Sequence, residues 1–382
     1  MRHGRRPRRA DRVSPQAIGH GDRVTLLAAA PPTGADAALQ RVAAGAWARD
    51  RDPAFPTSAM AALGAAGVLG ATVPAQGTGL SFAGELALVR AVARADGSVG
   101  RIVDGHLNAV ERVALLAPPD LRAETLEAVA AGQCWLGLWG ADPVAGEGER
   151  ARVERAGDGL RLEGTKVFCS GAGGLHAALV VVADGDARRL AFVERGPAVE
   201  IDRSWFAGSG LRASESHRVT FHGAPVRALL GGPDELGREP WFGRDAIRTA
   251  ATWAGLTDTA HAAARAALAS RAAGGDELAA LAAGRMLAAA GTIDRWLDDA
   301  GRRAGDHPAA PLTAHSVALR AAVAGAASAL VEEALRAAGS RALATGGALD
   351  RAARDLRLFL LQHRLDPLLA RTGRASLAEG PA

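Results

Sequence analysis

The chain of 382 residues contains only two cysteines, Cys134 and Cys169. Neither has a second potential ligand at the short spacing that zinc sites show. Two cysteines are also too few for the disulfide framework of a small secreted domain. We therefore expect a cytoplasmic protein in a reducing compartment, with no metal site.

Lysine and tyrosine are almost absent, since Lys166 is the only lysine and there is no tyrosine. The isoelectric point is about 10.1, yet the formal net charge is only +4. Because few groups titrate between neutral pH and the deprotonation of arginine, the isoelectric point overstates the positive field. The arginine excess accompanies an excess of alanine and glycine, so it indicates a compositional bias. No nucleic-acid partner is expected.

Long apolar runs are missing as well. The alanine-rich stretches are interrupted by charged residues before they reach the roughly 20 residues that cross a bilayer, so no membrane partner is expected. The first residues, MRHGRRPRRADR, are basic and lack the apolar segment of a signal peptide directly behind them. We interpret residues 1–34 as a flexible basic tail, and a nucleic-acid-binding or membrane-binding arm is the alternative.

Hydrophobic residues make up 48% of the chain, enough for a sizeable core and more than one domain. Residues 35–133 have helical spacing, and Asp96 begins one of these helices. Residues 134–228 alternate like short strands, with a hairpin turn at 157–159. Residues 241–375 are predicted to form four long helices with short loops, which is typical of an up-and-down bundle.

Four segments, in order, are similar to motifs of one family. The segments LGAAGVLG, GTKVFCSG, GLRASESHRVTF and LDRAARD begin at Leu63, Gly164, Gly210 and Leu349. With the order of the three regions, they resemble the acyl-CoA dehydrogenase superfamily of flavoproteins. The resemblance implies an α+β fold with an N-terminal helical domain, a middle antiparallel β domain and a C-terminal four-helix bundle.

The resemblance also implies a flavin between the β domain and the bundle, FAD by default and FMN as the alternative. Ser170 falls where the family has a hydroxyl group beside the flavin N5 atom, and Phe168 where an aromatic ring covers the flavin. The segment WGADPVAG resembles the family loop whose backbone amides meet the flavin edge. The implied cofactor-binding residues are Leu138, Gly140, Ala141, Phe168, Ser170, Arg271 and Gly339. Because little else of the family's adenosine-diphosphate segment remains around Arg271, FMN stays open.

The carboxylate base of a dehydrogenase is missing. The family's glutamate after the Arg-Asp pair corresponds to His363, and the alternative position on the first bundle helix is Ile247. Glu147 replaces part of the flavin-loop motif, and its charge would repel a phosphate of coenzyme A. Histidine can act as a base near neutral pH, so α,β-dehydrogenation of an acyl thioester is the leading interpretation.

The flavin monooxygenase branch of the superfamily is the alternative. The resemblance to it implies that Ser170, His106 and His363 are catalytic together, in a dry pocket that stabilises a flavin C4a-hydroperoxide. A degenerate, non-catalytic member is the third interpretation. The expected partners are a small-molecule substrate, with acyl-CoA as one candidate, and a flavin reductase or electron-transfer protein. The family resemblance also predicts a homodimer or homotetramer.

Overall fold

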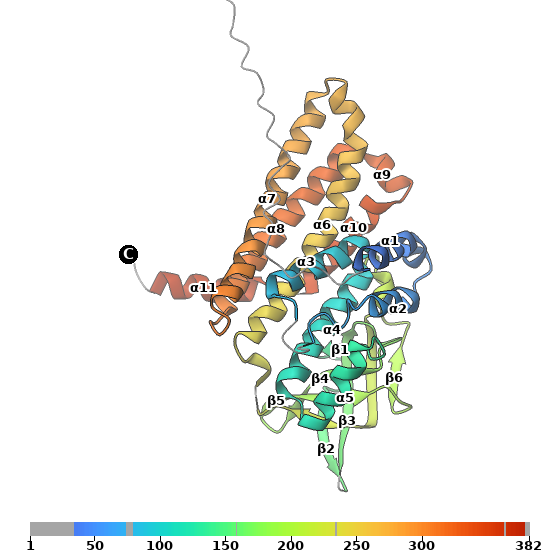
Figure 1. Cartoon of the computed structure of the whole chain (residues 1–382), viewed down its shortest axis with the longest axis vertical. Helices are drawn as coiled ribbons and strands as arrows, with labels where there is room; N and C mark the ends of the chain where they lie inside the picture. Colours follow the sequence, from blue (N-terminus) through green and yellow to red (C-terminus); the bar gives the residue numbers. More distant parts are fainter. Residues whose placement is uncertain (1–33, 74–78, 158, 234, 363, 379–382) are drawn as a thin grey trace, which may run out of the picture.

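Figure 1 shows a computed structural model of the chain, which describes residues 34–73, 79–157, 159–233, 235–362 and 364–378. N-terminal helices, a β-sheet and C-terminal helices follow one another along the chain. The predicted fold is therefore confirmed in its order. Residues 1–33, most of the predicted basic tail, lie outside the described residues.

The N-terminal region begins with helices whose starts the sequence encodes locally. Its helices are α1 (Ala35–Arg51), α2 (Thr57–Ala65), α3 (Phe82–Ala95), α4 (Gly97–Leu116) and α5 (Pro119–Ala130). Ser81 caps α3, because its Oγ accepts a hydrogen bond from the N–H of Gly84 at 3.2 Å. Asp96 caps α4, since its Oδ1 accepts from the N–H groups of Ser98 and Val99 at 2.9 and 3.1 Å. The predicted helix start at Asp96 is thus confirmed.

The middle region is one sheet in the order β6-β7-β3-β2-β4-β5-β8, with β1 added on β4. Its strands are β1 (Leu136–Trp139), β2 (Arg152–Ala156), β3 (Gly159–Cys169), β4 (Ala177–Asp184), β5 (Ala187–Glu194), β6 (Val199–Asp202), β7 (His217–Pro225) and β8 (Ala228–Leu230). The predicted hairpin is the antiparallel pair β2–β3. A short 3₁₀ helix, η1 (Arg212–Ser214), precedes β7.

The prediction that this domain is antiparallel is wrong in one respect, because the sheet is mixed. Strand β1 pairs in parallel with β4 along its whole length. Strand β2 meets β4 only at Arg152 and Ala183, also in parallel. Since β2 leaves most of that edge of β4 free, β1 supplies the partners that the backbone N–H and C=O groups of β4 require.

The C-terminal region contains α6 (Trp241–Ala273), α7 (Glu277–Asp306), α8 (Thr313–Ala338), α9 (Ser340–Ala344), α10 (Ala348–Gln362) and α11 (Asp366–Ala378). Helices α6, α7, α8 and α10 form the bundle above the sheet, and α11 projects from it (Figure 1). Pro367 lies in the first turn of α11, where proline is favourable, so it begins this helix. Helix α8 is long and apolar enough to cross a membrane, but it packs along α6 and α7 within the bundle.

A buried cluster of charges joins the N-terminal helices to α6. Arg248 is fully buried and pairs with Glu85 of α3 at 2.7 Å and with Glu111 of α4 at 2.8 Å. Arg244 contacts the same two carboxylates, and Arg112 pairs with Asp245 at 2.5 Å. We call these residues the junction cluster: Glu85, Glu111, Arg112, Arg244, Asp245 and Arg248. Each arginine faces a carboxylate, so the cluster is balanced in charge.

Candidate functional site

The end of β3 departs from regular strand geometry. Its ladder with β7 runs to the pair Lys166–Val219 and resumes at Cys169–His217, so two residues of β3 oppose one of β7. In this bulge Phe168 has a φ of 52°, in the left-handed region that residues other than glycine rarely adopt. Strained backbone of this kind persists where the surrounding structure holds it, and it is concentrated at functional sites.

The strain places an aromatic ring at the surface. The Phe168 side chain is 38% exposed, although the three residues before it in β3 are buried. Its ring packs edge-on against Trp205, with 4.9 Å between the ring centroids. An exposed Phe168 ring that packs on a half-buried Trp205 is the kind of surface that a flat aromatic ligand such as a flavin can cover.

Ser170 lies two residues further along and belongs to a chain of three hydroxyl groups. Its Oγ lies 2.8 Å from Oγ of Ser216, which lies 2.8 Å from Oγ of Ser214. Ser214 and Ser216 are fully buried, whereas Ser170 retains 7% exposure. We call Phe168, Ser170, Trp205, Ser214 and Ser216 the strand-end site. The resemblance pointed to Ser170, and the other two serines stood in a motif without an assigned role.

The loop after β1 lies against this site. The N–H of Val167 donates to the carbonyl oxygen of Ala141 at 3.2 Å. Lys166 Nζ donates to Asp142 Oδ1 at 2.5 Å and to the Gly140 carbonyl at 3.4 Å. Burial lowers the pKa of Lys166, and the Asp142 carboxylate opposes this shift. The only lysine of the chain therefore holds the predicted flavin loop in place.

Trp139 joins the end of β1 to the strand-end site. Trp139 follows Leu138 at the end of β1, and its Nε1 donates to the carbonyl oxygen of Ser170 at 3.1 Å. Gly140 and Ala141 are thus held against the end of β3, whereas the Leu138 side chain packs against a different buried cluster, the one that contains Leu136 and Leu179.

Glu147 supports the exposed aromatic pair. Its Oε1 accepts a hydrogen bond from Nε1 of Trp205 at 3.2 Å, and its Oε2 accepts from the N–H of Val144 at 3.1 Å. The departure from the family motif at this position therefore braces the loop against Trp205. Sequence reasoning assigned Glu147 only a repulsive effect, because its partner lies far away along the chain.

Two of the predicted cofactor residues lie elsewhere. Arg271 is at the end of α6, and its guanidinium donates to the Ala337 carbonyl at 2.9 Å, close to Gly339 at the end of α8. Figure 1 shows that the ends of α6 and α8 point away from the sheet. Within one chain, Arg271 and Gly339 therefore do not join the strand-end site.

His106 has a structural position. It is fully buried in α4, its Nε2 lies 3.0 Å from the Leu69 carbonyl, and its Nδ1 accepts from the N–H of Leu136 at 3.0 Å. Burial lowers the pKa of His106 to about 4. Both ring nitrogens are used by the backbone, so these contacts argue against the predicted catalytic role. Sequence spacing could place His106 on a buried face but could not reveal these two partners.

The positions expected for a base give no carboxylate. His363 lies outside the described residues. Gln362, the last residue of α10, has a buried side-chain nitrogen with no partner in the described part of the chain. Ile247 is fully buried in the core, and its neighbour Arg248 belongs to the junction cluster.

The Arg-Asp pair of α10 positions the backbone that leads to the serines. Arg354 pairs with Asp50 of α1 at 2.6 Å and also donates to the Ser209 carbonyl. Asp355 Oδ1 accepts from the N–H of Leu211 at 2.5 Å, immediately before η1. Burial raises the pKa of Asp355 to about 7. The motif therefore clamps three regions together next to Ser214.

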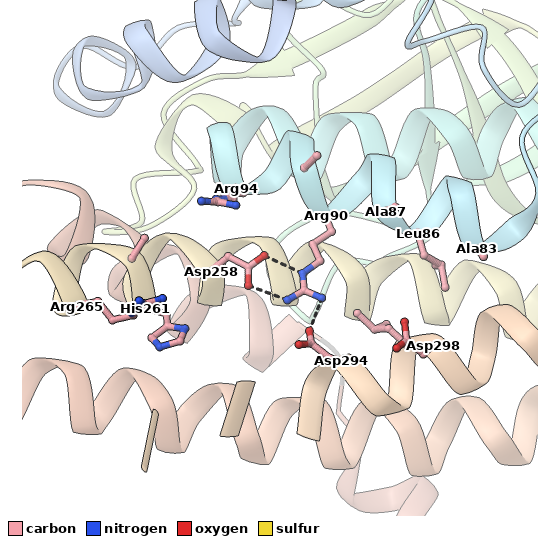
Figure 2. Close-up of a pocket in the computed structure, with 13 residues that line it drawn as sticks. Ala83, Leu86, Ala87, Arg90, Arg94, Asp258, His261, Arg265, Asp294 and Asp298 are labelled. Atoms are coloured by element: carbon pink, nitrogen blue, oxygen red, sulfur yellow. Dashed lines mark hydrogen bonds and ion pairs between the residues drawn. The ribbon is translucent and has the colours of Figure 1, made fainter. Parts of the chain in front are cut away.

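Figure 2 shows a separate groove of about 630 Å³ between α3, α6 and α7. Arg90 crosses it and pairs with Asp258 at 2.7 Å and with Asp294 at 2.7 Å. None of the predicted flavin residues lines this groove. Its ion pairs tie the three helices together, and it is distinct from the strand-end site.

Comparisons with known proteins agree with this arrangement. Residues 33–133 match the family model described as acyl-CoA dehydrogenase, N-terminal domain. Over 200 residues, the chain is 29% identical to the dibenzothiophene monooxygenase of Rhodococcus erythropolis, a match that covers 49% of this chain and 48% of that protein. The match therefore spans about half the length of this curated relative.

Solved structures are similar over nearly the whole chain. FMN-bound TdsC from Paenibacillus sp. A11-2, a dibenzothiophene monooxygenase, superposes with a TM-score of 0.77 at 20% identity, covering 91% of this chain and 97% of that one. The nitrososynthase from Micromonospora carbonacea var. africana gives a TM-score of 0.75 at 26% identity, covering 89% and 94%. This chain therefore contains a region that matches the acyl-CoA dehydrogenase N-terminal domain, and over nearly its whole length it has the fold of an FMN-bound dibenzothiophene monooxygenase.

Proposed function

We propose that the protein is a monooxygenase that uses reduced FMN and molecular oxygen to oxygenate a small, largely apolar molecule. The observation that carries the proposal is the strand-end site, in which a strained Phe168 lies beside a buried serine chain that ends at Ser170. The relative from Rhodococcus erythropolis is a dibenzothiophene monooxygenase, and TdsC from Paenibacillus binds FMN. This support favours the alternative over dehydrogenation, which was the leading interpretation from the sequence.

The residues present fit a flavin. Phe168 and Trp205 offer an exposed aromatic surface, and Ser170 offers a hydroxyl that can donate or accept a hydrogen bond. Bound reduced flavin supplies the electrons and activates oxygen. The protein would hold the Ser170 hydroxyl in a fixed position, cover one face of the flavin with aromatic rings and exclude water from the site.

FMN suits the single chain better than FAD. The segment around Arg271 resembles the family segment that meets the adenosine diphosphate group of a neighbouring subunit, so the case for FMN rests on how little of that segment remains. Of the rest of the motif around Arg271, only Gly275 is kept. A reductase that delivers reduced FMN is accordingly part of the proposal, together with a cytoplasmic location and a homo-oligomeric state.

A dehydrogenase would need a base that removes a proton from the substrate. Glutamate is absent from both family positions, and Ile247 at one of them is an apolar core residue. Oxygen transfer needs no such carboxylate. The site therefore suits oxygenation better than proton abstraction.

The test begins with flavin binding and ends with the product. The purified full-length chain is titrated with FMN and FAD, then supplied with reduced FMN from a separate flavin reductase, ¹⁸O₂ and indole or dibenzothiophene. We expect tighter binding of FMN than of FAD, and a product carrying one ¹⁸O atom. Failure to bind either flavin would overturn the proposal, and so would bleaching of the bound oxidised flavin by acyl-CoA thioesters.

A matched pair of variants assigns the activity to the site. Phe168→Ala should weaken FMN binding and lower ¹⁸O incorporation, because it removes the exposed ring. Phe192→Leu, in the buried face of β5, should leave FMN binding unchanged. If the wild type and Phe168→Ala bind FMN with equal affinity, the flavin does not bind at the end of β3.

A further inference from the structure

We propose that Ser216 and Ser214 are positioning residues that let Ser170 reverse its hydrogen bond to the flavin, and that they thereby favour binding of the reduced form. The inference rests on the proposed function and goes beyond it, because it assigns a role to two buried serines that never reach the cofactor themselves. The evidence is the unbroken chain of hydroxyl groups from Ser170 to Ser214.

The backbone around the chain fixes the three side chains. The N–H of Gly171 donates to the Ser214 carbonyl at 2.7 Å, and Nε1 of Trp139 donates to the Ser170 carbonyl at 3.1 Å. These two donors are therefore engaged by carbonyl oxygens and do not compete for the hydroxyls. The serine side chains hydrogen-bond to one another, in line, at 2.8 Å for each step.

The turn before β7 is held as tightly. Leu211 and Glu215, which flank η1, both have a positive φ, of 50° and 43°. Asp355 anchors the N–H of Leu211, and Arg203 donates to both oxygens of Glu215 at 2.9 Å. A strained turn that is anchored on both sides presents Ser214 and Ser216 in a fixed geometry, as preorganised support for a site requires.

A hydroxyl has one proton to donate and two lone pairs that accept. The chain can therefore run in either direction, with each hydroxyl donating inward or outward. Oxidised flavin accepts a hydrogen bond at N5, whereas reduced flavin carries a proton there and donates. Ser170 must donate outward in the first case and accept in the second.

Ser216 matters in only one of these directions. When Ser170 accepts from the flavin, its own proton needs an acceptor, and Ser216 Oγ is the neighbour at 2.8 Å. Without Ser216, that proton would be buried without a partner, which is costly. When Ser170 donates outward, its proton faces the flavin and Ser216 is not needed as an acceptor. Loss of Ser216 should therefore weaken the binding of reduced flavin selectively.

The experiment measures the dissociation constants of oxidised and reduced FMN for the full-length chain, the latter under anaerobic conditions. Ser216→Ala should raise the dissociation constant of reduced FMN about five- to tenfold, as expected for one lost hydrogen-bond acceptor. The dissociation constant of oxidised FMN should change by less than about twofold. If binding of reduced FMN weakens tenfold relative to oxidised FMN, the two-electron reduction potential of the bound flavin falls by about 30 mV. Ser214→Ala should have a smaller effect in the same direction.

Two further variants separate the chain from general damage. Ser204→Ala is the matched control, since Ser204 is an exposed β-domain serine that donates to Asp202 and lies outside the chain. Ser216→Thr retains a hydroxyl and should restore the wild-type ratio. If Ser216→Ala weakens both forms of FMN equally, or neither, the hydroxyl chain is overturned while the proposed function stands. If the wild type binds no flavin, both are overturned.

Discussion

The junction cluster and the strand-end site both bury polar side chains, yet they differ in how those groups are used. At the junction each arginine faces a carboxylate, and Arg248 is fully enclosed. At the strand end a hydroxyl chain stops at Ser170, beside a strained and exposed Phe168. Buried polarity alone therefore does not mark the functional region. The strand-end site differs from the junction in combining backbone strain with a hydroxyl chain that ends beside a partly exposed aromatic ring.

Removal of Arg248 should break the junction with the largest effect on stability. Arg248→Met leaves Glu85 and Glu111 buried with fewer partners, which should cost about 3–5 kcal/mol of unfolding free energy. Urea denaturation measures the loss, and FMN affinity of the folded protein should remain unchanged. Arg227→Met is the control, because its pairs with Glu124 and Glu194 are exposed and should contribute little to stability. Equal losses in the two variants would contradict the structural role of the cluster.

His106 should make the unfolding free energy of the protein depend on pH in the acidic range. Because burial lowers its pKa from 6.5 to about 4, the unfolded chain binds a proton that the folded chain does not. The stabilisation is complete above pH 6.5 and is lost as pH falls towards 4, by about 3 kcal/mol from the shift. His106→Gln can keep both hydrogen bonds without this titration.

The slope of unfolding free energy against pH checks this. Between pH 6.5 and 4 it should be smaller in His106→Gln than in the wild type. An unchanged slope in His106→Gln would mean that His106 is not held neutral by the fold.

Asp355 joins α10 to the turn before β7, so its removal should affect both the stability of the fold and the strand-end site. Asp355→Ala leaves the N–H of Leu211 without its acceptor and should cost about 1–3 kcal/mol of unfolding free energy. Asp355→Asn keeps an acceptor oxygen and should lose less. Because Leu211 leads into the serine turn, Asp355→Ala should also weaken FMN binding. Thermal denaturation and FMN titration test this, and a stability loss with unchanged FMN affinity would uncouple the clamp from the site.

Local sequence signals were sufficient for much of the fold. Caps such as Ser81 and Asp96 begin helices through hydrogen bonds to residues two or three positions away, so the sequence contains both partners. The parallel pairing of β1 with β4 could not be predicted in this way, because it joins segments that are far apart along the chain. Pairing of that kind is decided by the tertiary fold.

The site divides along the same line. The family motif pointed to Phe168 and Ser170, but the bulge depends on the register between β3 and β7. The serine chain likewise forms only when β3 reaches the turn before β7, which brings Ser216 and Ser214 to Ser170. The spacing of His106 likewise could not reveal its hydrogen bonds, because both partners are backbone groups far away along the chain.

Phe168→Gly should give the smallest change in stability, and it distinguishes the two regions most directly. Glycine relieves about 1 kcal/mol of left-handed backbone strain. It also removes an aromatic contact with Trp205 worth about 0.5–1.5 kcal/mol beyond the buried area of the ring, so the relief of strain offsets part of the loss. FMN affinity should nevertheless fall about tenfold with the lost ring.

Leu211→Gly is the matched control, because Leu211 has a similar φ of 50° but is fully buried. It should lose about 2–4 kcal/mol, since the core contacts outweigh the relief of strain. If Phe168→Gly lost as much stability and kept its FMN affinity, Phe168 would be a core residue and the strain at the end of β3 would have no function.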